Sequence, residues 1–200
     1  WDGSVTNQMP PIAAELPVSS LTWTLESRRN VEYMFQLKQP VEVRNDDSLI
    51  GVYYIDTSKR SSKNIYQISC SDALGVLGGD NFPGGVYTSY SAKKLLGEIV
   101  DGDFPLTIEA EDVPLTGILQ PCTRREAIQQ VLFAWGVCVS TDGTDGIRVL
   151  SLGTVPEVIS QNRVYLGATA ETAAIVTEVR VTAHSYTASA DGGVEINGQR

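Results

Sequence analysis

Side chains that carry most enzyme and metal chemistry are scarce in this 200-residue sequence. It has one histidine, His184, and three cysteines, Cys70, Cys122 and Cys138. A zinc site needs about four nitrogen or sulfur ligands, and a Ser-His-Asp or Cys-His site would have to use His184. The patterns G-x-S-x-G and G-x-x-x-x-G-K-[ST] are also missing. We therefore interpret His184 as a surface or edge residue of a strand. We predict no catalytic residue, no metal site and no cofactor.

Positively charged residues and long apolar runs are also scarce. The chain has 15 Lys and Arg residues against 24 Asp and Glu residues, so its formal net charge is -9. Binding to a nucleic acid duplex needs clustered Lys and Arg, and a membrane helix needs roughly 20 consecutive apolar residues. We therefore expect neither nucleic acid as a partner nor insertion into a membrane. No signal peptide is visible.

Disulfides are not expected. Cys122 and Cys138 lie on either side of a predicted helix, which at about 1.5 Å per residue holds them roughly 20 Å apart. The Cα atoms of a disulfide lie within about 7 Å of each other. Reduced, partly buried thiols fit a protein made in a cytoplasm.

The strongest local pattern covers residues 121–152. Thr123 and Glu126 have the spacing of a capping box. The apolar residues that follow recur with the period of a helix, at positions 127, 128, 131, 132, 134 and 135. Arg124 and Arg125 are expected to face water. Gly136 suits the left-handed residue that ends a helix.

Two β-prone segments, 137–139 and 147–150, come directly after this helix. They flank a Gly- and Asp-rich connection at 141–146, which is typical of a hairpin. The stretch therefore predicts a helix that packs on its own hairpin.

These residues also carry a resemblance to a known family. The helix with REAIQQ at 125–130, followed by Gly136 and the hairpin, resembles the baseplate-hub or tail-tip proteins of bacteriophages and prophages. Three further matches are GGVY at 84–87, SAKKLLGEI at 91–99 and YQISCSDAL at 66–74. Together they cover roughly residues 50–152. The resemblance implies a structural protein of the virion tail that forms an oligomeric ring, usually a trimer, between tail tube and tip. The implied partners are the tail tube, distal tail and tape measure proteins.

The rest of the chain predicts an α+β fold. Its first half reads as an antiparallel meander with strands at 31–38, 41–44, 49–56 and 65–70, and an arm or edge strand at 20–25. A turn is expected at 45–47 and a bulge at Gly51. One helical turn is expected at 72–77, a flexible connector at 78–85, a helix from 91 to 99, a strand at 104–110 and a loop at 111–120. Further strands are expected at 163–166 and 174–187.

We therefore predict an antiparallel β-rich, barrel-like domain with an inserted α-β-α-β-β subdomain. The expected divisions are an N-terminal arm at 1–30, the barrel-like domain at 31–80 plus 156–190, the inserted subdomain at 84–155 and a tail at 191–200.

Three groups of side chains are candidates for function. Lys59, Arg60 and Lys63 form a basic loop on an acidic chain, which indicates either an ordinary hairpin tip or a docking contact for an acidic neighbour. The acidic run consists of Glu98, Asp101, Asp103, Glu109, Glu111 and Asp112, which could be a solvated rim or bind calcium. Aromatic candidates for stacking on a carbohydrate are Trp23, Tyr53, Tyr54 and Trp135.

These observations leave three hypotheses. The first is a structural component of a phage or prophage tail tip or baseplate hub. The second is a cell-wall-directed glycosidase or peptidase of a tail, which would use the acidic run. The third is a carbohydrate-binding module. We expect the protein not to be an enzyme.

Overall fold

The computed structural model describes residues 2–6, 16, 18–27, 35–141, 144–151, 184–188 and 194–198. The chain divides into two compact units, Trp1–Leu152 and Gly153–Arg200. The fold is α+β and rich in antiparallel strands, as the sequence predicts. Among the described residues, no helix is long and apolar enough to cross a membrane.

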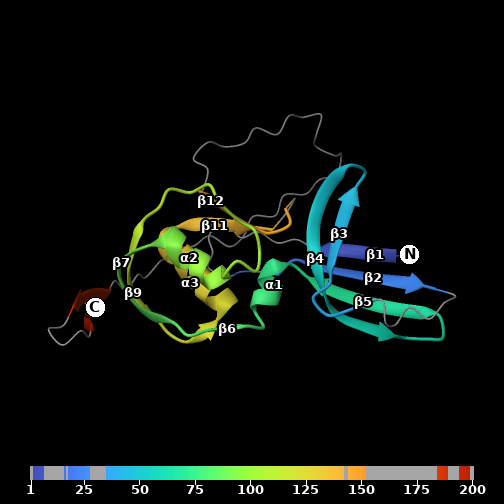
Figure 1. Ribbon diagram of the computed structural model, residues 1–200, viewed down its shortest axis with the longest axis horizontal. Helices are drawn as coiled ribbons and strands as arrows, with labels where there is room; N and C mark the ends of the chain where they lie inside the picture. Colours follow the sequence, from blue (N-terminus) through green and yellow to red (C-terminus); the bar gives the residue numbers. More distant parts are fainter. Residues whose placement is uncertain are drawn as a thin grey trace, which may run out of the picture. The chain divides into compact units, whose positions relative to one another are not determined.

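The first half of the first unit is an antiparallel sheet in the order β1-β2-β5-β4-β3 (Figure 1). Its strands are β1 (Asp2–Thr6), β2 (Ser20–Glu26), β3 (Pro40–Asn45), β4 (Ser48–Arg60) and β5 (Ile65–Ser71). Its apolar face buries a cluster made of Leu21, Tyr53, Ile55, Ile68 and Cys70. Because side chains alternate along a strand, the opposite face of β2 and β5 is polar.

Three expectations for this half need correction. The segment at 20–25 is a strand, but β2 lies between β1 and β5 and is not at the edge. The basic loop expected at Lys59, Arg60 and Lys63 is wrong for its first two residues, because β4 continues to Arg60. Of the strand expected at 31–38, residues 31–34 lie outside the described residues, and 35–38 are not in a strand.

Two bulges interrupt the regular pairing of β4 with its neighbours. One register shift lies between Val43 and Arg44, which pair with Gly51 and Leu49, so the bulge expected at Gly51 is confirmed. A second shift lies between Ile55 and Thr57. A bulge adds one residue to one strand and reverses which side chains reach each face. As a result, Ile55 packs in the apolar cluster while Thr57 is exposed.

The second half of the unit contains three helices and several short strands. In chain order they are α1 (Ala73–Leu77), β6 (Asn81–Phe82), β7 (Gly85–Ser91), α2 (Ala92–Val100), β8 (Leu106–Ile108), β9 (Pro114–Leu119), β10 (Cys122–Thr123), α3 (Arg124–Trp135), β11 (Val137–Ser140) and β12 (Ile147–Ser151). They form one three-stranded sheet, β11-β12-β8, and the pairs β7-β9 and β6-β10. The loop expected at 111–120 is therefore wrong, because β9 pairs with β7.

The α3 helix and its hairpin are present as predicted. The Thr123 side chain accepts a hydrogen bond from the Glu126 amide, and the Glu126 carboxylate accepts one from the Thr123 amide at 2.9 Å. Gly136 ends the helix with φ of 74°, a conformation that costs glycine little. β11 and β12 then pair antiparallel, from Val137 with Ser151 to Ser140 with Arg148.

One continuous apolar core holds α2, α3 and the β11-β12-β8 sheet together. Leu96, Ile99, Ile128, Leu132 and Val149 are all fully buried in it. The periodicity of α2 is that expected from the sequence, with Ser91 as N-cap. On α3 the apolar stripe is narrower than predicted, because Ala134 is exposed and Trp135 is only half-buried.

The second unit, considered by itself, has one described strand pair. β13 (His184–Ala188) pairs antiparallel with β14 (Val194–Gly198). His184 is thus in a strand, and half of the tail expected at 191–200 forms another. The segments 163–166 and 174–183 lie outside the described residues. Closure of the first sheet by residues 156–190, and the domain division built on it, stay predictions.

Candidate functional site

The basic residues singled out from the sequence lie at the free end of the β4-β5 hairpin. Lys59 and Arg60 are the last residues of β4, and Lys63 lies in the turn that follows. The Arg60 guanidinium donates to the carbonyls of Ser62 at 3.3 Å and Lys63 at 2.5 Å, and it lies 5.9 Å from the ring centre of Tyr66. Arg60 therefore organises the turn, while the amino groups of Lys59 and Lys63 are left to reach outward.

These cations have no acidic partner in the part of the chain that the structure describes. Its ion pairs involve Lys38, Arg44, Arg124 and Arg148. Lys59 and Lys63 are both exposed. On a chain of net charge -9, such a group is available to a carboxylate of a neighbouring subunit.

The acidic run is dispersed over separate local contacts. Glu98 accepts a hydrogen bond from the Tyr90 hydroxyl at 2.5 Å, and Glu109 pairs with Arg148 at 2.9 Å. Asp112 accepts from the Ser91 hydroxyl and the Lys93 amide, which lowers its carboxyl pKa. Within the described residues, no three His, Cys, Asp or Glu side chains converge as metal ligands would. Glu98, Glu109 and Asp112 are therefore each engaged in a separate local contact.

The largest departure from the sequence expectation is Arg124, which is 9% exposed instead of facing water. Its Nε and one terminal nitrogen donate to the carbonyls of Ile99 and Val100, each at 2.5 Å. Its other terminal nitrogen donates to Asp103 at 2.5 Å. The last carbonyls of a helix have no partner inside the helix. Arg124, at the start of α3, therefore caps the end of α2.

A second buried charge, Asp72, ties three segments together. Its carboxylate accepts hydrogen bonds from the Ser19 amide at 3.0 Å, the Gly75 amide at 2.9 Å and the Thr141 hydroxyl at 2.9 Å. Burial raises the pKa of Asp72, and these hydrogen bonds oppose the rise. Because its bonding capacity is used within the fold, Asp72 has a structural role as N-cap of α1 and as a link to the segment after β11.

The aromatic residues considered as stacking platforms are mostly parts of the core. Tyr53 is 2% exposed. Tyr54 packs edge-on against Phe104 with ring centres 5.1 Å apart, and the Trp135 indole donates to the Glu111 carbonyl at 2.8 Å. Trp23 packs against the apolar cluster of the five-stranded sheet. None of the four therefore stands out as an exposed sugar platform.

The cysteines are free thiols, as expected. Burial raises the pKa of Cys70 to about 12. Burial and the Glu126 carboxylate raise the pKa of Cys122, although it lies just before the N-terminus of α3, where the helix dipole lowers a thiol pKa. Neither thiol is activated as a nucleophile.

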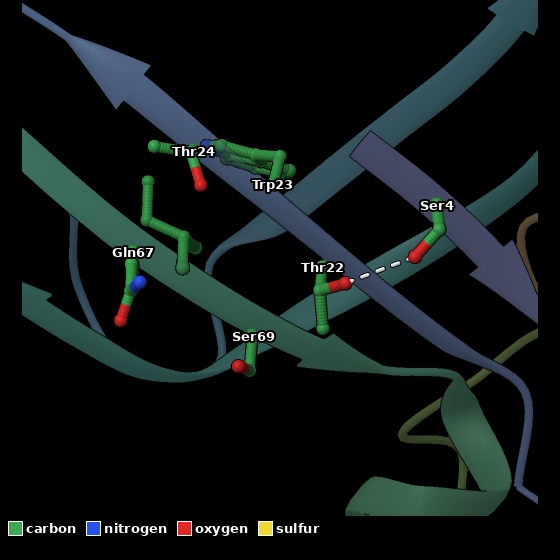
Figure 2. A pocket seen from close by; sticks show the side chains of 7 residues that line it. Ser4, Thr22, Trp23, Thr24, Gln67 and Ser69 are labelled. Atoms are coloured by element: carbon green, nitrogen blue, oxygen red, sulfur yellow. Dashed lines mark hydrogen bonds between the residues drawn. The ribbon is translucent and has the colours of Figure 1, made fainter. Parts of the chain in front are cut away.

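A shallow groove of about 400 Å³ lies on the five-stranded sheet, and no sequence pattern indicates it. It crosses β1, β2 and β5 and is lined by Ser4, Thr22, Trp23, Thr24, Gln67, Ile68 and Ser69. Figure 2 shows Ser4 and Thr22 hydrogen-bonded between β1 and β2, at 3.1 Å, with Gln67 and Ser69 on the neighbouring strand. We call it the hydroxyl groove.

No family model matches the sequence, and no curated protein matches it either. Solved structures do match. The chain is similar to the tail protein from Neisseria meningitidis MC58, with a TM-score of 0.54 and 16% identity, over 67% of this chain and 42% of that one. It is also similar to the prophage tail protein gp18 from Listeria monocytogenes EGD-e, with a TM-score of 0.52 and 10% identity, over 98% of this chain and 59% of that one.

At these identities the likeness establishes a shared fold. The chain has a fold found in phage and prophage tail proteins, so the resemblance carried by residues 50–152 is confirmed at that level. The chain spans about half the length of the tail proteins that it matches, 42% of one and 59% of the other.

Proposed function

We propose that this chain is a structural component of a phage or prophage tail, at the tail tip or baseplate hub. The observation that carries the proposal is the shared fold, which in the Listeria tail protein extends over 98% of this chain. The internal use of polar groups supports it. Arg124, Asp72 and the acidic run serve caps and links between segments, as suits a rigid building block.

The edges of the five-stranded sheet are the first proposed assembly surface. β1 and β3 are its outer strands, and in the described residues neither has a second neighbour. An open edge presents unpaired N–H and C=O groups to which another strand can add. Contact between unlike surfaces of identical copies closes into a ring when the rotation permits it. We propose a homo-oligomeric ring, with a trimer as the expected size.

The basic end of the β4-β5 hairpin is the second proposed surface. Lys59, Arg60 and Lys63 would contact acidic side chains of an adjoining tail protein, which would fix the register of docking and make it sensitive to salt. The proposed partners are the tail tube, distal tail and tape measure proteins.

The test is co-assembly of the full chain with the tail tube, distal tail and tape measure proteins of the same phage or prophage. Chromatography with light scattering should show a complex. The double variant Lys59→Glu, Lys63→Glu should weaken it about tenfold or more, which corresponds to about 1.4 kcal/mol. Arg60 stays in place because it organises the turn.

The matched control is Lys93→Glu, Lys94→Glu, which makes the same change in charge at the first turn of α2. The added carboxylates face the positive end of the helix dipole but also Asp112 and Glu98, so circular dichroism checks that this variant is folded before its binding is compared. Two results would contradict the proposal: a monomer that binds none of the three tail proteins at high concentration, or an equal effect of both double variants.

A further inference from the structure

The hydroxyl groove has hydrogen-bonding capacity that the described residues do not use. The side chains of Ser4 and Thr22 bond each other. Those of Thr24, Gln67 and Ser69 make no hydrogen bond to any other described residue, although the register brings them together in cross-strand pairs. Thr22 lies opposite Ser69, and Thr24 lies opposite Gln67. Each hydroxyl can donate and accept, and the amide supplies two donors and an acceptor.

The main chain of β2 and β5 under the groove is already paired. β2 lies between β1 and β5, and β5 lies between β2 and β4, so the N–H and C=O groups under the groove belong to the ladders. A peptide strand therefore cannot add to the sheet between β1 and β4, and the open edge of the sheet on this side lies beyond the groove, at β1. Any ligand must bind through side chains, across the face of the sheet.

The described lining is also uncharged. Trp23 and Ile68 alternate with the polar residues and pack in the apolar cluster on the other face, so hydroxyl and amide groups dominate the open side. Lys59 pairs with Gln67 in the ladder but is not part of the lining. Such a surface offers nothing to balance a bare anion or a metal ion, whereas it matches a ligand that itself presents neutral donors and acceptors.

We propose that the hydroxyl groove binds a neutral saccharide. Sugar hydroxyls both donate and accept, as the groove side chains do. The volume of about 400 Å³ is within the range of about 300–1,000 Å³ that is usual for small-ligand sites. This inference is independent of the tail role proposed above, because it concerns the face of the sheet and not its edges or the β4-β5 hairpin.

The experiment is calorimetric titration of the full chain with two neutral probes, chitotetraose and maltotetraose, and one anionic probe, tetragalacturonate. We expect saturable binding of at least one neutral probe and weaker binding of the anionic one. The double variant Gln67→Ala, Ser69→Ala removes two bonding side chains from the groove. It should lower the affinity about tenfold, since each lost hydrogen bond weakens binding several-fold. Thr24→Val, which removes one hydroxyl at nearly constant volume, should lower it less.

The matched control is Thr88→Ala, Thr107→Ala, which removes two exposed hydroxyls from β7 and β8. It should leave the affinity unchanged. Near-ultraviolet circular dichroism checks that every variant is folded. The inference is overturned by no heat with either neutral probe at about 10 mM, a concentration that would reveal millimolar binding. Preference for tetragalacturonate, or equal losses in the groove and control variants, also overturns it.

Discussion

Replacement of Arg124 by alanine tests whether the contact between α2 and α3 depends on one side chain. The guanidinium bonds the carbonyls of Ile99 and Val100 and the carboxylate of Asp103, and the side chain as a whole is 11% exposed. A hydrogen bond from a charged donor contributes about 1.5–3 kcal/mol, and such bonds are not additive. Asp103 is 53% exposed, so solvent screens that pair and its share is small.

The two carbonyls therefore dominate, and we expect Arg124→Ala to lower the free energy of unfolding by about 3 kcal/mol. That is a large part of the roughly 5–15 kcal/mol that stabilises a typical domain. In urea, with a slope near 2 kcal/mol per M, the midpoint should fall by about 1.5 M at an unchanged slope. The stability of Arg124→Lys should lie between those of the unchanged protein and Arg124→Ala, because an ammonium group cannot reproduce the planar set of donors of a guanidinium.

Arg125→Ala is the matched control. It is the next residue of the same helix, and the structure shows no hydrogen bond or ion pair from its side chain to another described residue. Its effect should stay within about 0.5 kcal/mol. If Arg124→Ala cost less than about 1 kcal/mol, or no more than its neighbour, the buried guanidinium would not be the cap of α2.

Two further predictions concern local backbone chemistry. Thr123→Ala removes the N-cap of α3 and should cost about 1 kcal/mol in urea unfolding. Bonds from Thr123 lower the pKa of Glu126, so its contribution should be complete above the ordinary value of 4.5 and disappear as pH falls through the lower folded value. Thr123→Ala keeps the larger cause, the backbone amide of residue 123, and removes the hydroxyl, so this acid dependence should shrink in part, and an unchanged pH profile would contradict the bond from the Thr123 hydroxyl to Glu126. Gly84→Ala should lose about 2 kcal/mol or more, since φ is +73° and the new Cβ would lie 2.2 Å from the Leu119 carbonyl oxygen. In Gly97→Ala the new Cβ would have no atom within 4 Å, so this change in α2 should raise the free energy of unfolding by about 0.5–1 kcal/mol. Thermal unfolding measures both variants, and a stabilised Gly84→Ala or a destabilised Gly97→Ala would contradict the reasoning.

Elements with local causes could be predicted from the sequence. The boundaries of α3 follow from Thr123, Glu126 and Gly136, all within or beside the helix. The same holds for α2 after Ser91. Periodicity cannot show what covers a polar residue, however. Arg124 is buried because its partner, the Ile99 carbonyl, is 25 residues away in the sequence.

The strands that the sequence missed depend on distant partners. β9 contains Pro114 and Gly117, which disfavour a strand, but Pro114 is its first residue, where no ladder bond is lost. Its partner β7 supplies the pairing. In β4 the bulge after Ile55 breaks the alternation of apolar and polar residues. A prediction that relies on this alternation therefore ends the strand too early.

The candidate surfaces differ in the same way. Lys59, Arg60 and Lys63 are adjacent in the chain and contrast with its acidic composition, so charge alone identifies them. The hydroxyl groove is assembled from single polar residues of three strands whose order in the sheet the sequence does not reveal. Only the register of β1, β2 and β5 brings those residues together.

The Asp72 carboxylate connects a residue 53 positions earlier with one 69 positions later. The sheet half and the helical half of Trp1–Leu152 are therefore both held by this carboxylate. Loss of either donor would leave a buried oxygen without a hydrogen bond, which costs stability. If either half unfolds locally, the Asp72 carboxylate loses a hydrogen-bond donor, and the other half loses a contact that stabilises it. The two halves should thus resist mechanical load together, as the proposed place in a phage tail would require.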